Sequence, residues 1–427
     1  MDGPPPRPPL PPVPPPRHAF LAFFLTVLLF STVALLTIAP PTRLLRRLHR
    51  LLIRPLSVLL GRIPLPPALQ TPSDLAVAIR SFAGYQHSQQ LSLDKKWLAY
   101  EAMPKRHRRL GDKLAWRETL GRAEDAVERN ARVTDELAAL GLELARKEGI
   151  PYGLRSMFWR ESGRVVETLK HFVRDWSEEG KSEREALFPP ILDALRDEFP
   201  ASEGKVLVPG CGLGRLAYEI ASLGFGTTAN DFSHFMNLGS SLIFTRTHIP
   251  NQHSLSPYVH SFSHHRTAEN LLRVVSFPDV VPSKEVKLQF EPGDFLSLFP
   301  ADETFDAIVT LFFIDTASNL LDYFETIWRL LVPGGIWINE GPLLYYGNPG
   351  MELPLEDVVR LAELVGFRVE KRKSLKQLKY TGDDLGMYTS VALFYFFCIP
   401  TFAYDCEFWV ARKPLAPDSA GSRQKRE

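Results

Sequence analysis

The hydrophobic and polar positions of this chain follow three patterns in succession. Residues 19–39 carry no formal charge over twenty-one positions. From about residue 75 to residue 199 helix-forming and charged residues dominate, and apolar residues between Val133 and Leu144 recur at steps of four, three and four, the spacing of one buried helical face. After Pro200 short apolar runs alternate with helical patterns, which is typical of a parallel sheet covered by helices. The pattern therefore predicts a helical subdomain followed by an α/β domain.

Seven short apolar runs in the second half of the chain have the length and composition of buried strands. They lie at residues 205–208, 226–230, 286–290, 305–311, 335–339, 367–371 and 406–411. A long insertion at about 239–285 separates the second run from the third, and only a short helix near 237–246 is expected there. The fold class that these patterns favour is α/β, with a seven-stranded sheet behind an amino-terminal helical subdomain.

The amino-terminal region predicts a membrane anchor. Ten of the first sixteen residues are proline, so residues 1–18 are expected to be extended or disordered. The uncharged run 19–39 would span roughly 30 Å as a helix, whereas a cleaved signal peptide has a shorter apolar core. Five arginines lie within residues 40–54 against two before the run, so the positive-inside rule places the rest of the chain in the cytosol.

Other interpretations of this region stay open. A signal peptide is one, and a membrane-surface or organelle-targeting helix at residues 43–62 is another. A mis-assigned start codon would make the leader non-native and the protein cytosolic throughout. The expected boundaries are 1–18 for the proline-rich segment, 19–39 for the transmembrane helix, 40–74 for a basic linker, 75–199 for the helical subdomain, 200–414 for the α/β domain and 415–427 for a disordered tail.

Composition excludes several classes of function. Fifty lysines and arginines are balanced by 49 aspartates and glutamates, so the chain has no basic field for binding nucleic acid without sequence preference. Its three cysteines form no C-x-x-C pair, which argues against a disulfide framework and against a cysteine-based zinc or redox site. Five histidines of the insertion are irregularly spaced, and we expect them to be solvated rather than to bind a metal.

The most informative motif is a glycine loop between a buried strand and a helix. Residues 205–220 are KVLVPGCGLGRLAYEI, with Gly210, Gly212 and Gly214 in the turn. Glycine lacks a Cβ, so the backbone can approach a ligand closely. A dinucleotide-binding loop would have its third glycine at position 215, which is Arg215. The observed G-x-G-x-G spacing favours an S-adenosylmethionine-dependent methyltransferase over an NAD-dependent oxidoreductase.

Acidic residues follow three of the predicted strands, at the edge where ligands bind in open α/β sheets. Asp231 follows the second strand and can accept hydrogen bonds from both hydroxyls of a ribose. Asp294 and Phe295 follow the third strand, where a carboxylate can bind the adenine amino group and a ring can pack on the base; an ordinary turn with a core phenylalanine is the alternative. Asp315 follows the fourth strand. Residues 330–338, LLVPGGIWI, join a helix to a buried strand as in class I methyltransferases.

Four longer motifs resemble one family, the carnosine N-methyltransferases. They are HFVRDWSEEGK at 171–181, LVPGCGLGRLA at 207–217, FFIDTA at 312–317 and IWINEGPLLY at 336–345. The resemblance extends from about residue 79 to residue 414. It implies a class I methyltransferase fold that transfers a methyl group from S-adenosylmethionine to an imidazole nitrogen of carnosine, giving anserine.

The resemblance also implies roles for individual residues. His171 and Arg174 occupy positions that bind the methionine end of the cofactor, although the family has glutamine at the first. The implied cofactor-binding residues are His171, Arg174, Gly210, Gly212, Gly214, Asp231, Asp294, Phe295 and Leu311. The implied substrate-binding residues are Asp315, Tyr346 and Tyr404. Tyr346 replaces an expected histidine, which leaves the identity of the acceptor open.

Asp315 is the expected catalytic residue. A free imidazole has a pKa near ~6.5, so at neutral pH it needs the correct tautomer rather than a strong base. A carboxylate that accepts the N–H of one ring nitrogen would direct the lone pair of the other toward the methyl group and stabilise the imidazolium that forms. A helix N-cap is the structural alternative for Asp315, and the two roles are compatible.

Several hypotheses remain beside the leading one. The acceptor could be another imidazole, including a histidine-containing peptide or protein, and a noncatalytic membrane-anchored binding module is a further alternative. Homodimerisation is retained as an assembly hypothesis. The apolar run 390–401 lengthens the connection into the last strand and is too short to span a bilayer. It is interpreted either as a retained intron or as a hydrophobic loop near the membrane.

Overall fold

The computed structural model describes residues 73–150, 161–345, 349–380, 383, 385–387 and 402–415. The expected transmembrane helix at 19–39, Tyr346, the apolar run 390–401 and most of the expected carboxyl-terminal tail lie outside these residues. Within them, no helix combines the length and the hydropathy needed to cross a bilayer.

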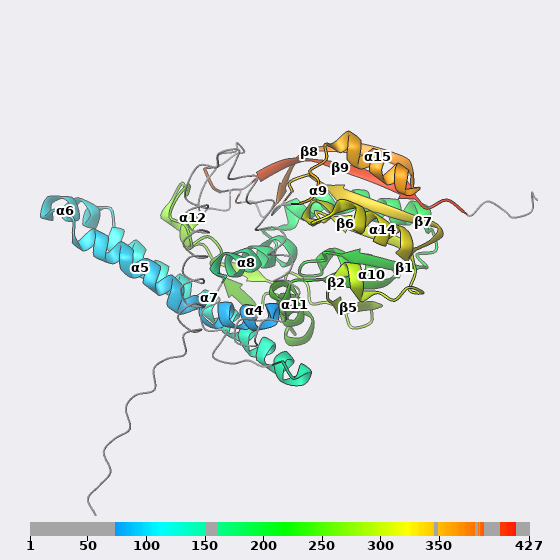
Figure 1. The fold of residues 1–427 in the computed structure, drawn as a ribbon. Helices are drawn as coiled ribbons and strands as arrows, with labels where there is room; N and C mark the ends of the chain where they lie inside the picture. The colour runs from blue at the N-terminus through cyan, green and yellow to red at the C-terminus, as the bar shows by residue number, and fades with distance from the viewer. Residues whose placement is uncertain are drawn as a thin grey trace, which may run out of the picture. The chain divides into compact units, whose positions relative to one another are not determined.

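Among the described residues, the region before the sheet is helical, as the sequence predicts, and contains six helices. Figure 1 shows them in blue to green. They are α4 (Asp74–Ala83), α5 (Tyr85–Glu101), α6 (Lys105–Lys113), α7 (Trp116–Glu148), α8 (Ser162–Trp176) and α9 (Lys181–Glu198). The predicted apolar stripe of α7 is buried at Val133, Leu137 and Leu140. The helix ends at Gly149, whose φ of 66° suits a left-handed C-cap.

The sheet has the seven strands expected from the apolar runs. They are β1 (Lys205–Pro209), β2 (Gly226–Asp231), β5 (Leu288–Pro292), β6 (Phe305–Leu311), β7 (Leu331–Gly341), β8 (Arg368–Tyr380) and β9 (Phe402–Arg412). Their order is β5-β2-β1-β6-β7-β9-β8. The pairs from β5 to β7 are parallel, whereas β9 pairs antiparallel with both β7 and β8. The chain thus has an α/β methyltransferase-type sheet with its strand order reversing between β1 and β6.

Helices cover both faces of this sheet (Figure 1). One apolar core joins α9 and α10 (Arg215–Ser222) to inward-facing residues such as Val206, Val208 and Ile338. The other joins α14 (Leu320–Leu330) and α15 (Leu355–Val365) to Ile308 and Trp337. Because parallel strands are buried on both faces, they contain the nearly continuous apolar runs seen in the sequence.

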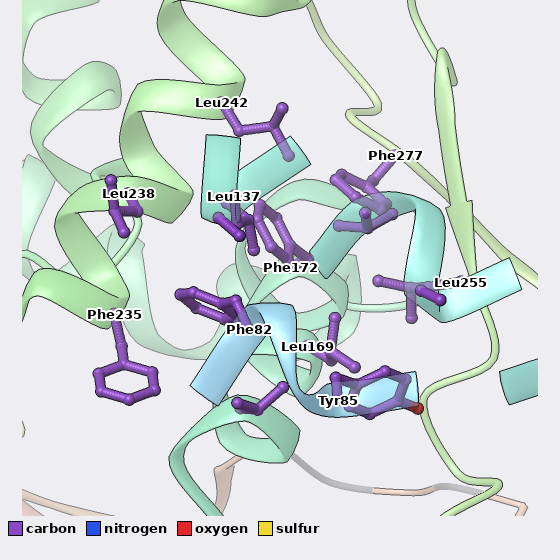
Figure 2. Packing of buried hydrophobic residues seen from close by; sticks show 14 of the residues in the cluster. Phe82, Tyr85, Leu137, Leu169, Phe172, Phe235, Leu238, Leu242, Leu255 and Phe277 are labelled. Atoms are coloured by element: carbon purple, nitrogen blue, oxygen red, sulfur yellow. The ribbon is translucent and has the colours of Figure 1, made fainter. Parts of the chain in front are cut away.

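The insertion after β2 is more regular than predicted. It contains α11 (His234–Ser241), a π-helical turn (Leu242–Arg246), α12 (Ala268–Leu272) and a two-stranded sheet of β3 (His253–Leu255) and β4 (Val275–Phe277). Figure 2 shows Leu238, Leu255 and Phe277 packed with Phe82 and Phe172 of the helical subdomain. The insertion therefore completes the core of the helical subdomain rather than forming a solvated loop.

Candidate active site at the carboxyl edge of the sheet

The glycine loop lies between β1 and α10, where the sequence predicts it. Gly210, Gly212 and Gly214 have φ values of 66°, 58° and 81°, all in the left-handed region. A Cβ on Gly210 would lie 2.4 Å from the Phe313 ring, so the backbone here needs both the conformation and the small size of glycine. A Cβ on Gly212 would meet nothing closer than Asp175 Oδ2 at 3.7 Å. The loop is therefore tight at its base and open above Gly212.

Asp231 is bonded to this loop. It ends β2, and its Oδ2 accepts the amide N–H of Gly212 at 2.9 Å while its Oδ1 accepts that of Ser233 at 2.8 Å. Burial raises the pKa of Asp231 to about 6, and the two amide donors oppose that shift. Each carboxylate oxygen has a second lone pair, so the group can still accept hydrogen bonds from a ligand.

Asp294 and Phe295 lie beside Asp231. The amide of Gly293 donates to the Asp231 carbonyl at 3.0 Å, which brings the turn after β5 to the end of β2. Asp294 is the N-cap of α13 (Phe295–Leu298), with Oδ1 accepting the Leu296 amide at 3.0 Å. Phe295 is buried and meets the rings of Phe313 and Tyr323 edge to face. Both predicted residues thus have structural roles in the turn after β5.

Asp315 is a buried acid that follows β6. It lies in a 3₁₀ turn (Ile314–Thr316), is 7% exposed, and accepts the amide N–H of Leu344 at 2.9 Å through Oδ2. Burial raises its pKa to about 6. The N-cap alternative is wrong for this residue, because Asn319 caps α14 by accepting the Leu321 amide.

Phe312, three residues before Asp315, packs against side chains of β8 and β9. Its φ of 51° is unusual for a bulky residue, and its amide donates to the Glu340 carbonyl at 2.9 Å. Its ring packs on Tyr380 at 4.6 Å and meets the Tyr404 ring at 5.9 Å. Leu311, at the end of β6, packs partly buried on the same face of the sheet. The predicted residues Leu311 and Tyr404 therefore flank Phe312.

His171 and Arg174 reach this group from α8. Arg174 is buried and pairs with Asp175 at 2.8 Å and with Glu183 at 2.7 Å, while its guanidinium lies 4.8 Å from the Tyr380 ring centroid. His171 Nε2 lies 3.4 Å from the Tyr380 hydroxyl, and its buried Nδ1 has no hydrogen-bond partner among the described residues. Burial lowers the pKa of His171, so the imidazole is neutral. Tyr380, which the sequence did not single out, joins both predicted residues to Phe312.

A buried ionic network joins the glycine loop to the helical subdomain. Arg215, the first residue of α10, donates to Asp279 Oδ1 at 2.7 Å and to the Asp175 carbonyl at 2.9 Å. Arg184 of α9 pairs with the other oxygen of Asp279. Trp176 donates through Nε1 to the Leu213 carbonyl at 3.1 Å. These contacts join the end of α8, the insertion and the glycine loop.

Glu340 is a second residue that the sequence did not single out. It lies near the end of β7, is fully buried, and neither carboxylate oxygen has a hydrogen-bond partner among the described residues. Burial raises the pKa of Glu340 to about 8, so the acid is mostly protonated at neutral pH. An acid inside the apolar run 336–341 was the available signal.

The histidines of the insertion are less solvated than expected. The side chains of His253 and His265 are 8% and 9% exposed. His260 Nε2 lies 2.6 Å from the Tyr85 hydroxyl, and burial lowers the pKa of this histidine to about 4. His248 and His264 are exposed. In the part of the chain that the structure describes, no group of three or more His, Cys, Asp or Glu residues could hold a metal ion.

Comparison with known proteins gives one consistent family. The model of the carnosine N-methyltransferase family matches residues 159–414. The chain is 39% identical over 264 residues to carnosine N-methyltransferase of Mus musculus, an alignment that covers 59% of this chain and 63% of the mouse protein. It is 34% identical over 319 residues to the Schizosaccharomyces pombe enzyme of that name, with 69% and 82% covered. It is 38% identical over 271 residues to the Drosophila melanogaster protein carnosine N-methyltransferase unmet, an alignment that covers 60% of this chain and 57% of the fly protein. The aligned chain thus spans less than two thirds of the mouse and fly proteins.

The family match extends from α8 to the segment after β9, and so includes the glycine loop, Asp231, Asp315 and Tyr404. It covers more than half of the chain. The chain belongs to the carnosine N-methyltransferase family.

Proposed function

We propose that this chain transfers a methyl group from S-adenosylmethionine to an imidazole nitrogen of carnosine, giving anserine and S-adenosylhomocysteine. The observation that carries the proposal is the position of Asp315 relative to the glycine loop. Phe313, two residues before Asp315, lies directly against Gly210, so the turn that contains the acid packs on the base of the glycine loop. The family to which the chain belongs supports the choice of reaction.

The residues around the loop suit an adenosyl cofactor. The left-handed glycines leave space above Gly212, and the buried Asp231 has lone pairs for the two ribose hydroxyls. We assign Asp294 and Phe295 to the adenine side, Leu311 to a wall of the cofactor pocket, and Arg174 with His171 to the methionine end. S-adenosylmethionine supplies the methyl group as an activated sulfonium carbon.

Asp315 would orient the acceptor. Because the Leu344 amide already holds Oδ2, the carboxylate is fixed in direction and can accept an N–H from an imidazole. That bond would select the tautomer whose other nitrogen has a free lone pair, and the negative charge would stabilise the imidazolium formed by methyl transfer. With a pKa of about 6, Asp315 is ionised at neutral pH. Tyr404 and Tyr346 are proposed as further acceptor contacts.

Mass spectrometry tests the reaction directly. The full chain, S-adenosylmethionine and carnosine should yield a product heavier by one methyl group, with fragmentation placing that group on the ring. Methylation of a histidine peptide in preference to carnosine would keep the chemistry and change the acceptor. Cofactor binding by calorimetry without any methyl transfer would instead indicate a noncatalytic binding module.

The membrane anchor at 19–39 and the homodimer remain predictions of the same proposal. Fractionation of cells that express the full chain tests the anchor, because an integral protein stays in the membrane pellet after a carbonate wash. Recovery of the whole chain in the supernatant would contradict it. Light scattering of the purified protein tests the dimer.

A further inference from the structure

One guanidinium ties the chain beyond β8 to two other parts of the molecule. Arg273 follows α12, and its side chain is 13% exposed. Its Nη2 donates to Glu179 at 2.6 Å and to Asp383 at 2.7 Å. Glu179 lies in the turn between α8 and α9, and Asp383 lies just after β8. These partners are 94 and 110 positions away in sequence, so the contact joins three separate segments.

Further contacts fix the guanidinium in this position. It lies over the Tyr258 ring at 3.7 Å from the centroid, and the Tyr258 hydroxyl donates to Glu179 at 3.0 Å. Nη1 of Arg273 donates to the Asn270 carbonyl at 2.8 Å. A planar guanidinium with several donors already aligned holds two carboxylates with more directional precision than an ammonium could. We call Arg273, Glu179 and Asp383 the clamp.

The segment after β8 is docked on the insertion by more than the clamp. The Met387 amide donates to the His264 carbonyl at 2.7 Å. The Asn270 side chain donates to the Leu385 carbonyl at 3.0 Å. The described residues of 383–387 therefore have a defined position against α12 and its flanking loop.

Two of the clamp residues lie close in the chain to the two residues of the Tyr380–Arg174 contact. Tyr380 lies three positions before Asp383, and Arg174 lies five positions before Glu179. Tyr380 packs on Phe312 with the ring centroids 4.6 Å apart, and Phe312 lies three positions before Asp315 in the chain. Tyr404 is paired with Leu378, two residues before Tyr380. Movement of the chain after β8 would therefore shift both tyrosines relative to Asp315.

We propose that Arg273 is a positioning residue for the acceptor, acting through Asp383 and Glu179 to hold Tyr380 and Tyr404 beside Asp315. This inference rests on the proposed function, which defines the acceptor as an imidazole. The bond between Gly212 and Asp231 lies on β1 and β2 and involves none of the clamp residues. Arg174 also keeps its own pairs with Asp175 and Glu183 when the clamp is lost. Loss of the clamp should therefore alter acceptor binding more than cofactor binding.

Steady-state kinetics of Arg273→Met test this split. We expect the KM for carnosine to rise about tenfold, the effect of losing one charge-assisted hydrogen bond, with the Kd for S-adenosylmethionine within about twofold of the wild type. Arg273→Lys should recover part of the loss, because an ammonium can reach one carboxylate. Arg122→Met is the matched control, since it removes an exposed pair with Glu269 of α12 at 2.7 Å and should leave both constants unchanged. An equal loss of cofactor affinity, or an unchanged KM, would overturn the proposal.

Hydrogen exchange tests the clamp without relying on turnover. Arg273→Met and the nearly isosteric Asp383→Asn should each accelerate exchange at the Leu385 and Met387 amides, by about tenfold or more. The double variant should add little, because both changes break the same contact. Additive effects, or unchanged exchange, would contradict the clamp. If the wild-type chain methylates no imidazole, the proposed function is refuted. If the two variants still accelerate exchange in that case, the clamp itself is confirmed.

Discussion

The proposed reaction requires that one buried carboxylate, Asp315, is ionised beside a neutral imidazole. Asp315→Asn keeps the shape of the side chain and an oxygen for the Leu344 amide but removes the charge. We expect turnover of carnosine to fall by about 10²–10³-fold, because the amide stabilises the developing imidazolium poorly. Calorimetry should show unchanged cofactor affinity. Loss of cofactor binding together with turnover would indicate that Asp315 is structural.

The pH dependence of the reaction follows from the same residue. In the proposed mechanism Asp315, with a pKa of about 6, is deprotonated and the imidazole of carnosine, with a pKa of about 6.5, is neutral. With cofactor saturating, log kcat/KM should therefore fall below pH 6 with a slope that approaches about 2. In Asp315→Asn the residual activity should fall with a slope of about 1. A slope of 1 in the wild-type profile would exclude Asp315 as the ionising group.

The buried acid Glu340 should make the folded state less stable as the pH rises, whereas the activity is expected to fall as the pH drops. Its pKa rises from 4.5 to about 8 on folding, so the folded state retains a proton that the unfolded state loses between these values. The free energy of unfolding should fall by on the order of 3 kcal/mol between pH 4.5 and pH 7. It should level off above about pH 8, where both states have lost the proton. Glu340→Gln cannot ionise and should lack this loss, as urea denaturation at pH 5 and pH 8 can show. If the free energy of unfolding of the wild type and of Glu340→Gln changes equally with pH, the Glu340 carboxylate is stabilised by a partner and its pKa is not raised.

Sequence reasoning identified residues of the site whose neighbours are local in the chain. Gly212 and Asp231 are bonded across only 19 positions, and their spacing is visible in the motif. Tyr380 contacts His171 across 209 positions, and Arg273 contacts Asp383 across 110. Neither belongs to a local pattern, so only the folded chain shows them. Asp315 was found from its place after a strand, but its bond to Leu344 was not.

At the scale of the element, replacing glycine by alanine should have opposite effects in the glycine loop and in a helix. Gly210→Ala would place a Cβ 2.4 Å from the Phe313 ring at a φ of 66°, so the loop must distort. We expect cofactor affinity to fall by about tenfold or more. Gly121→Ala in α7 meets nothing within 4 Å and should stabilise the protein by about 0.5–1 kcal/mol, because alanine is the better helix former. Calorimetry measures the cofactor affinity of Gly210→Ala, and urea denaturation measures the stability of Gly121→Ala. Unchanged affinity in the first variant, or a loss of stability in the second, would contradict the prediction.

The seven strands of the sheet were predictable as elements, because a strand buried on both faces is an apolar run bounded by turns. Their lengths were not. β8 continues to Tyr380, well beyond the predicted end at 371, because its polar outer residues are paired with β9 rather than buried. The short strands β3 and β4 were missed for another reason. Three residues each are too few to show an alternating pattern, and their pairing depends on the helices they contact.

At the scale of the whole molecule, the helical subdomain and the sheet share buried charges. Asp279 lies just after β4 and pairs with Arg184 of α9 and Arg215 of α10. All three side chains are at most 13% exposed. Asp279 also donates its amide to the Trp176 carbonyl at 2.8 Å. The two predicted regions, 75–199 and 200–414, are therefore coupled through a polar network as well as through apolar packing.

This coupling predicts that one substitution outside the proposed ligand contacts destabilises both regions together. Asp279→Ala leaves two buried guanidiniums without this carboxylate and should lower the free energy of unfolding by about 3–5 kcal/mol. Asp197→Ala is the matched control, because its pair with Lys371 at 3.2 Å is more than half exposed and should contribute less than about 1 kcal/mol. Urea denaturation followed by circular dichroism and by tryptophan fluorescence should give one coincident, shifted transition for Asp279→Ala. Separate transitions for the helical and sheet regions would show instead that apolar packing alone joins them, and that Asp279 stabilises only its local surroundings.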